Sequence, residues 1–258
     1  MTIDFFCDLH MHSNYSDGTG TIEDMAKSAI AKGLTTICIT DHMPLPFYPW
    51  YSVDMDKIQV YRDEIGRVQK IYRNKLTLLT GLEIEYLPEI SDWIKPIIDL
   101  GWDYLIASVH GLFIDNTQYL INENEEEFNK TLNIVFNGDI KAFCRQYYHL
   151  VQQAVSTDWC DSVGHLDVIK KYNYSNQYFD EQSPWYRKLI EETLDVIKAH
   201  QLKMEINTAG FIQPIGQAYP SPWIIKDAIK RGIPIVMGSD SHAPETLGQY
   251  FDLAKVLP

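Results

Sequence analysis

Residues 8–12 read DLHMH and follow directly on the apolar stretch IDFFC at residues 3–7. Six more apolar stretches end in polar side chains, with TDH at 40–42, GLE at 81–83, SVH at 108–110, GH at 164–165, EIN at 205–207 and GSDSH at 238–242. These stretches are short and rich in β-branched residues, which is typical of buried parallel strands. The sequence therefore predicts seven strands, each ending in a side chain that can bind a ligand.

Amphipathic segments separate the predicted strands. We expect strands over 3–7, 35–40, 75–83, 104–109, 161–164, 203–207 and 234–238, and helices over 21–32, 54–73, 91–100, 122–156 with a break at 137–138, 184–200, 222–231 and 245–256. Thr21 and Asp24 have the spacing of a capping box, and Gly33 and Gly232 mark helix ends. Alternating strands and helices indicate parallel βαβ units and an α/β fold. Seven such units favour a closed or nearly closed barrel. An open doubly wound sheet is the alternative, although no GxGxxG motif supports a dinucleotide-binding version.

The composition argues for one folded domain over residues 1–258. The hydrophobic fraction is 45% and the charged fraction 22%, which is ordinary for a globular protein. Lys and Arg number 22 against 35 Asp and Glu, a net charge of −13 that disfavours nucleic acid and anionic membranes as partners. The first residues do not resemble a signal peptide, no stretch of 18 apolar residues occurs, and the four cysteines form no CxxC pair. We expect a soluble cytoplasmic protein whose oligomeric state the sequence does not predict.

Six of the eight histidines, His10, His12, His42, His110, His165 and His242, fall at predicted strand ends. In β/α barrels the C-terminal strand ends carry the active site. Alternate residues of a strand point the same way, so His10 and His12 aim two imidazoles at one point. The first and last strands are neighbours in a closed barrel, which brings Asp240 and His242 to the same place. Imidazoles and carboxylates together predict a metal site.

Carboxylates accompany these histidines. Glu83 ends an apolar strand, where a buried unpaired carboxylate is costly, so we expect it to bind a cation. Glu85 lies two residues on and points the same way, and we expect a supporting or solvent-facing role for it rather than a ligand role. Asp8 and Asp41 precede histidines closely, and they either orient imidazoles or stabilise the loops.

These motifs resemble a known family. DLHMHSNYSDG, TDH, GLE, SVH, GH and GSDSH occur in the order found in the polymerase and histidinol phosphatase (PHP) superfamily, over the whole chain. EINTAGF at 205–211, YPSP at 219–222 and GSDSHAPE at 238–245 resemble the stand-alone histidinol-phosphate phosphatases. The resemblance implies a distorted seven-stranded (β/α)7 TIM-like barrel of the PHP type that holds up to three metal ions.

The resemblance also implies the ligand sets. By position they are His10, His12, Glu83 and Asp240; then Glu83 as a bridge with His110 and His165; then Asp17, His42 and His242. Glu83, Asp240, His110 and Asp17 are thereby expected to be catalytic. Some relatives have His where this chain has Asp17, which leaves the preference of the third site open. Nitrogen and oxygen ligands without thiolate suit two or three Zn, Fe or Mn ions.

The implied activity is metal-dependent hydrolysis of L-histidinol phosphate to L-histidinol and phosphate, a step of histidine biosynthesis. We expect in-line attack at phosphorus by a hydroxide that bridges two metals. The alternative is a PHP phosphoesterase acting on another small phosphate, such as a nucleotide or a sugar phosphate. An amidohydrolase-type C–N hydrolase and a non-enzymatic metal-binding module are the remaining hypotheses.

Substrate contacts are less well defined by the sequence. Relatives carry a basic residue on the loop after His165, and Lys170 and Lys171 lie there, of which we favour Lys170 for binding the phosphate. The basic residue that relatives carry after the EINTxG stretch has no counterpart in residues 211–217. The aromatic loop over 43–51, with Phe47, Tyr48, Trp50 and Tyr51, is either a packed lid or a recognition surface.

Overall fold

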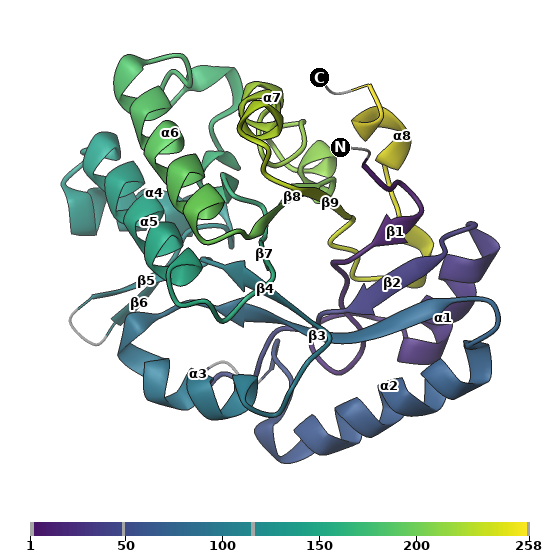
Figure 1. Ribbon diagram of the computed structural model, residues 1–258. Coiled ribbons are helices and arrows are strands. Elements are labelled where there is room, and N and C mark those ends of the chain that lie inside the picture. The colour runs from purple at the N-terminus through teal and green to yellow at the C-terminus, as the bar shows by residue number, and fades with distance from the viewer. Residues whose placement is uncertain (1–2, 48–49, 115–116, 257–258) are drawn as a thin grey trace.

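Seven parallel strands form one sheet in the computed structural model, which describes residues 3–47, 50–114 and 117–256 (Figure 1). The strands are β1 (Cys7–Asp8), β2 (Thr36–Ile39), β3 (Thr77–Glu85), β4 (Tyr104–Ser108), β7 (Ser162–Val163), β8 (Lys203–Asn207) and β9 (Ile235–Gly238). They pair in the order β1-β2-β3-β4-β7-β8-β9. A doubly wound sheet reverses its strand order at a switch point. This order has no reversal, so the open-sheet alternative is wrong.

The two outer strands of this order meet just beyond their ends. Leu9 N donates to Met237 O at 2.9 Å, His12 N donates to Ser241 O at 2.8 Å, and Asp240 N donates to His10 O at 2.9 Å. Met11 and Ser241 form a parallel bridge. The sheet is therefore curled into a nearly closed barrel, as predicted, and the DLHMH and GSDSH stretches lie side by side.

Helices surround the strands in Figure 1. They are α1 (Ile22–Ala31), α2 (Ile58–Tyr72), α3 (Ser91–Ile98), α4 (Glu125–Lys130), α5 (Ile140–Val155), α6 (Pro184–Ala199), α7 (Pro222–Arg231) and α8 (Phe251–Ala254). Thr21 and Asp24 form the predicted capping box of α1. Gly232 ends α7 with φ 73°, a left-handed conformation that glycine adopts without strain. Among the helices of the described residues, none is both long enough and apolar enough to cross a bilayer.

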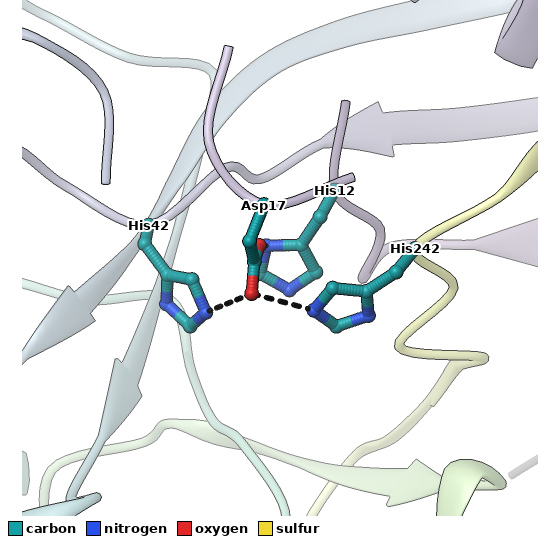
Figure 2. A group of neighbouring side chains, drawn as sticks. All are labelled: His12, Asp17, His42 and His242. Atoms are coloured by element: carbon teal, nitrogen blue, oxygen red, sulfur yellow. Dashed lines mark ion pairs between the residues drawn. The ribbon is translucent and has the colours of Figure 1, made fainter. Parts of the chain in front are cut away.

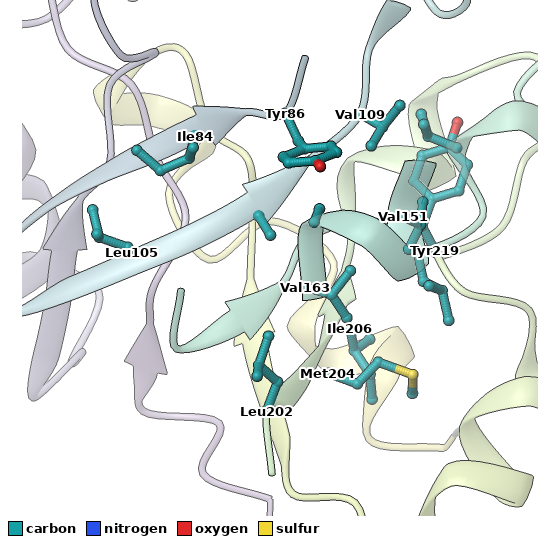
Figure 3. Close-up of a cluster of buried hydrophobic side chains, with 14 of the residues drawn as sticks. Ile84, Tyr86, Leu105, Val109, Val151, Val163, Leu202, Met204, Ile206 and Tyr219 are labelled. Atoms are coloured by element: carbon teal, nitrogen blue, oxygen red, sulfur yellow. The ribbon is translucent and has the colours of Figure 1, made fainter. Parts of the chain in front are cut away.

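The core lies between the outer face of the barrel and the helices. Ile84, Leu105, Val163 and Met204 come from four strands and are each at most 5% exposed (Figure 3). A separate cluster of Leu9, Cys38, Tyr104 and Ile106 is also buried. Tyr104 and Ile106 lie six and four residues before His110, and alternate residues of a strand point the same way. Both side chains therefore fill the barrel behind the polar rim. Apolar packing on both sides thus fixes the strand ends that carry the polar residues.

Several predicted elements differ from the structure. The first strand is Cys7–Asp8 rather than 3–7. The 122–156 helix is divided into α4, a π-helical turn over Thr131–Val135, and α5, with Gly138 at φ 79° near the expected break. The 245–256 helix is only Phe251–Ala254, because positive φ values at Gly248 and Tyr250 interrupt it. An antiparallel hairpin, β5 (Gly111–Ile114) with β6 (Thr117–Leu120), was not predicted.

Candidate metal centre

All nine ligands expected from the sequence gather at the C-terminal rim of the barrel. They form four overlapping groups, and within each group the candidate ligand atoms, nitrogen or oxygen, lie within 4.8 Å of one another. The groups are His12, Asp17, His42 and His242; His10, His12 and Glu83; His10, His165 and Asp240; and His42, Glu83 and His110. The rim contributes side chains from six strand ends, which explains how positions 10 to 242 meet in one place.

Glu83 lies at the middle of the cluster and is 1% exposed. Five imidazole nitrogens surround its carboxylate: His165 Nε2 at 2.9 Å, His110 Nε2 at 3.4 Å and His10 Nε2 at 3.5 Å from Oε1, and His42 Nδ1 at 2.9 Å and His12 Nε2 at 3.6 Å from Oε2. Burial alone would raise the pKa of Glu83, but the charges of His10, His110 and His42 outweigh it and hold that pKa well below its usual range. The carboxylate contacts imidazoles of all four groups from one position, as a carboxylate shared between metal sites would.

Asp17 lies among His12, His42 and His242 (Figure 2). Its Oδ2 atom lies 3.3 Å from His242 Nε2 and 3.8 Å from His42 Nε2, and its Oδ1 atom lies 3.8 Å from His12 Nδ1. The loop that carries Asp17 is held by Asp41, which accepts hydrogen bonds from Ser13 N, Ser13 Oγ and Ser16 Oγ. Of the two roles left open for Asp41, the structure shows loop stabilisation.

Asp8 likewise stabilises a loop, the one that follows β9. It is fully buried, and it accepts hydrogen bonds from Ser239 N and Gly248 N at 2.9 Å each. Both donors follow β9, so Asp8 holds the loop of Asp240 and His242 against β1. The carboxylate of Asp8 contacts no imidazole among the described residues.

Two further carboxylates orient imidazoles. Glu205 Oε1 lies 2.7 Å from His10 Nδ1, and Glu85 Oε2 lies 2.6 Å from His110 Nδ1. A carboxylate on Nδ1 fixes the tautomer and leaves Nε2 for a metal. The supporting role expected for Glu85 is thus what the structure shows, whereas the role of Glu205 was missed. The signal in the sequence was the place of Glu205 at a predicted strand end, in EIN at 205–207. In the structure a Cβ at Gly238 would clash with the Glu205 carboxylate, so glycine at that position leaves room for it.

The donor set fits divalent metal ions. Four buried ring nitrogens, His10 Nε2, His12 Nδ1, His12 Nε2 and His165 Nδ1, have no hydrogen-bond partner within the described residues. Such atoms are costly to bury unless something satisfies them. Burial, together with His242 and His42, lowers the pKa of His12 to about 3, so His12 is in the neutral form that binds metal.

Other imidazoles must lose a proton when metal binds. Burial disfavours charge on His110 and His242, but neighbouring carboxylates, Glu83 and Glu85 for the first and Asp17 and Asp240 for the second, outweigh it and raise both pKa values to about 9. These carboxylates attract a proton in the absence of a stronger cation. A divalent ion would replace those protons.

A cleft of about 720 Å³ opens over the cluster. Ligand residues including Glu83, Asp240 and His242 form part of its wall. Trp50 and Tyr51 of the predicted aromatic loop line it as well, whereas Phe47 stacks on Phe113 at 6.0 Å and Tyr48 lies outside the described residues. The side chains expected to bind metal are therefore open to a small molecule.

The preference for Lys170 as the phosphate-binding residue needs correction. Lys170 is fully buried, pairs with Asp167 at 3.0 Å, and donates to Ala218 O and Ser221 Oγ, so its ammonium is turned away from the cleft. Lys171 lines the cleft instead. No other lysine or arginine lines it within the described residues.

Comparison with known proteins adds independent information. A model of the PHP domain matches residues 8–209. A Deinococcus radiodurans protein named "Probable histidinol-phosphatase" is 34% identical to this chain, and the match covers 95% of this chain and 89% of that protein. The "Histidinol-phosphatase" of Bacillus subtilis (strain 168) is 27% identical over 95% of this chain and 96% of its own length.

Two crystal structures are similar to this fold. The histidinol phosphate phosphatase of Lactococcus lactis, described as complexed with zinc, L-histidinol and phosphate, has a TM-score of 0.74 and 25% identity, covering 97% of this chain and 91% of its own. A Listeria monocytogenes chain has a TM-score of 0.86 and 23% identity, covering 96% of this chain and 99% of its own. The similarity to the Listeria monocytogenes structure supports only the barrel fold.

Proposed function

The chain belongs to the PHP domain family, and we propose on this basis that it is a metal-dependent phosphomonoesterase that hydrolyses L-histidinol phosphate to L-histidinol and phosphate. One observation carries the proposal: a buried Glu83 carboxylate surrounded by five imidazoles at the base of an open cleft. The names of the relatives and the zinc, L-histidinol and phosphate of the Lactococcus lactis structure supply the substrate. Four free cysteines suit a reducing compartment, and we propose the cytoplasm.

The residues assigned to the metals are those of the rim. His10, His12, Glu83 and Asp240 would hold one ion, Glu83 with His110 and His165 a second, and Asp17 with His42 and His242 a third. When bound, such ions supply a nucleophile at neutral pH by lowering the pKa of water, and they polarise the phosphoryl group. Glu83, Asp240, His110 and Asp17 are the residues assigned to catalysis through this centre.

Side chains outside the ligand set have two roles in this scheme, binding the phosphate and orienting the imidazoles. Lys171 brings a positive charge to the cleft wall beside Asp240 and binds the phosphate. Its Nζ atom donates to Asn122 O at 2.6 Å, which fixes the direction of the side chain. Glu205 and Glu85 hold His10 and His110 in one tautomer, so that Nε2 faces the centre before substrate arrives.

The test is phosphate release from a panel of monoesters, with the metal content measured on the same sample. The panel contains L-histidinol phosphate, a nucleoside monophosphate and a sugar phosphate. We expect L-histidinol phosphate to have the highest kcat/KM, and chelated protein to be inactive until Zn, Mn or Fe is returned. A higher kcat/KM for one of the other two esters would assign that ester as the substrate and leave the metal-dependent hydrolysis of phosphate monoesters unchanged. Full activity in metal-free protein would refute the proposal.

A further inference from the structure

Two charged side chains line the cleft without belonging to the metal ligands. Of the described residues in the wall, Lys171 is the one cation and Glu123 the one carboxylate outside the ligand set. Lys171 has an assigned role at the phosphate. Glu123 has none, and its side chain is exposed and makes no hydrogen bond or ion pair within the described part of the chain. A free carboxylate in a substrate cleft is available to a ligand.

The backbone around Glu123 is anchored on both sides. The carbonyl of Asn122, the preceding residue, accepts hydrogen bonds from Lys171 Nζ at 2.6 Å and Tyr172 Oη at 3.1 Å. The following residue, Asn124, caps helix α4 by accepting from Glu127 N at 2.9 Å. The backbone of Glu123 is thus held beside Lys171, and its side chain is exposed on the same wall of the cleft.

The charges along the cleft wall alternate in sign. Asp240, at the metal ligands, and Glu123 are both close enough to Lys171 to act on its charge. With metal ions bound by the rim residues, these ions and Lys171 would form a cationic zone next to Glu123, the one carboxylate of the described wall outside the ligand set. A zwitterionic ligand matches this pattern, because its anionic group and its cationic group each find an opposite charge.

We propose that Glu123 binds the ammonium group of the substrate and thereby selects phosphate monoesters whose alcohol carries a positive charge. The inference rests on the proposed phosphomonoesterase function. In L-histidinol phosphate the amino group is on the carbon next to the ester CH₂, so a carboxylate beside the phosphate-binding lysine is within reach of it. Esters of neutral alcohols lack a partner for Glu123, and additional anionic groups, as in a second phosphate, are repelled by it.

The experiment compares two substrates in three proteins. Wild type, Glu123→Gln and Glu126→Gln are assayed with L-histidinol phosphate and with p-nitrophenyl phosphate, a monoester of a neutral alcohol. Glu126 is the matched control, because it is an exposed acid of α4 that does not line the cleft. Both substitutions remove one negative charge from the same short stretch of chain.

We expect Glu123→Gln to raise KM for L-histidinol phosphate on the order of 10-fold, as for the loss of a charge-assisted hydrogen bond, with kcat within about two-fold. Values for p-nitrophenyl phosphate should stay the same or improve, and Glu126→Gln should behave as wild type with both esters. An equal change with both esters, or no change with L-histidinol phosphate, would overturn the role of Glu123. Wild type that hydrolyses neither ester would overturn the phosphomonoesterase function instead.

Discussion

Replacing Lys170 with methionine separates a structural lysine from a substrate-binding one. The substitution keeps most of the aliphatic stem and removes the ammonium. In the folded protein that ammonium is fully buried, lies 3.0 Å from Asp167 Oδ2, and donates to Ala218 O at 3.1 Å and to Ser221 Oγ at 2.5 Å. Asp167 is fully buried too, and it accepts a hydrogen bond from Ser221 N at 2.9 Å. Lys170→Met thus leaves a buried carboxylate without its cation.

The cost follows from that burial. Removing one partner of a buried ion pair destabilises a protein by about 3–5 kcal/mol. For a chain of this length, 1 kcal/mol corresponds to roughly 2 °C in Tm, so the melting temperature should fall by about 6–10 °C. Because Lys170 is turned away from the cleft, KM for the phosphate ester should stay near the wild-type value in protein that remains folded.

The assay is thermal unfolding at fixed metal content, with steady-state kinetics on the same preparations. Lys188→Met is the control, because Lys188 is an exposed helix residue with a 3.6 Å pair to Glu192, and its loss should change stability by less than about 0.5 kcal/mol. Lys170→Met/Asp167→Leu should recover part of the loss, since no unpaired charge remains. A wild-type Tm together with a raised KM in Lys170→Met would refute the structural role and restore the phosphate contact.

Three further outcomes follow from the geometry. Lys171→Ala should raise KM and cost about 2–4 kcal/mol in kcat/KM without loss of metal, as measured by kinetics and elemental analysis, and an unchanged kcat/KM would mean that metals alone bind the phosphate. Burial lowers the pKa of Lys171, so its charge is lost at a lower pH than for an ordinary lysine. Because arginine keeps its charge, the alkaline fall in kcat/KM should move to higher pH in Lys171→Arg, and an unmoved pH profile would contradict this. Glu205→Gln should weaken metal binding about 10–100-fold in a direct titration, because His10 loses its orienting carboxylate, whereas wild-type affinity would show that His10 is held by other contacts.

The gathering of the nine expected ligands at one rim could be predicted because two periodicities coincide. Alternate residues of a strand share a face, and parallel strands of a barrel end at one rim, so HxH at 10–12 and DxH at 240–242 had to meet once β1 and β9 closed the sheet. Glu205 could not be assigned in the same way. A carboxylate at a strand end can bind a metal or orient a ligand, and only the position of β8 beside β9 shows that it reaches His10.

The choice between Lys170 and Lys171 was beyond the sequence for a similar reason. Both follow His165 closely, and their spacing from it differs by one residue. The 3₁₀ turn Val168–Lys170 brings Lys170 onto Asp167, three residues before it, and directs the next side chain into the cleft. The β5–β6 hairpin was missed because its strands are only four residues long and the residues between them, Asp115 and Asn116, are not one of the common two-residue turn pairs.

If a metal centre bridged by Glu83 hydrolyses the phosphate ester, the Glu83→Gln variant must lose both the activity and the metal. The measurement is phosphate release from L-histidinol phosphate, with metal content and Tm determined on the same sample and Glu89→Gln, an exposed acid six residues on, as the matched control. We expect turnover to fall by several orders of magnitude with loss of bound metal in a protein that stays folded, and the control to match wild type. Near-normal turnover by Glu83→Gln would refute the bridging role of Glu83 and assign the bridge to another carboxylate.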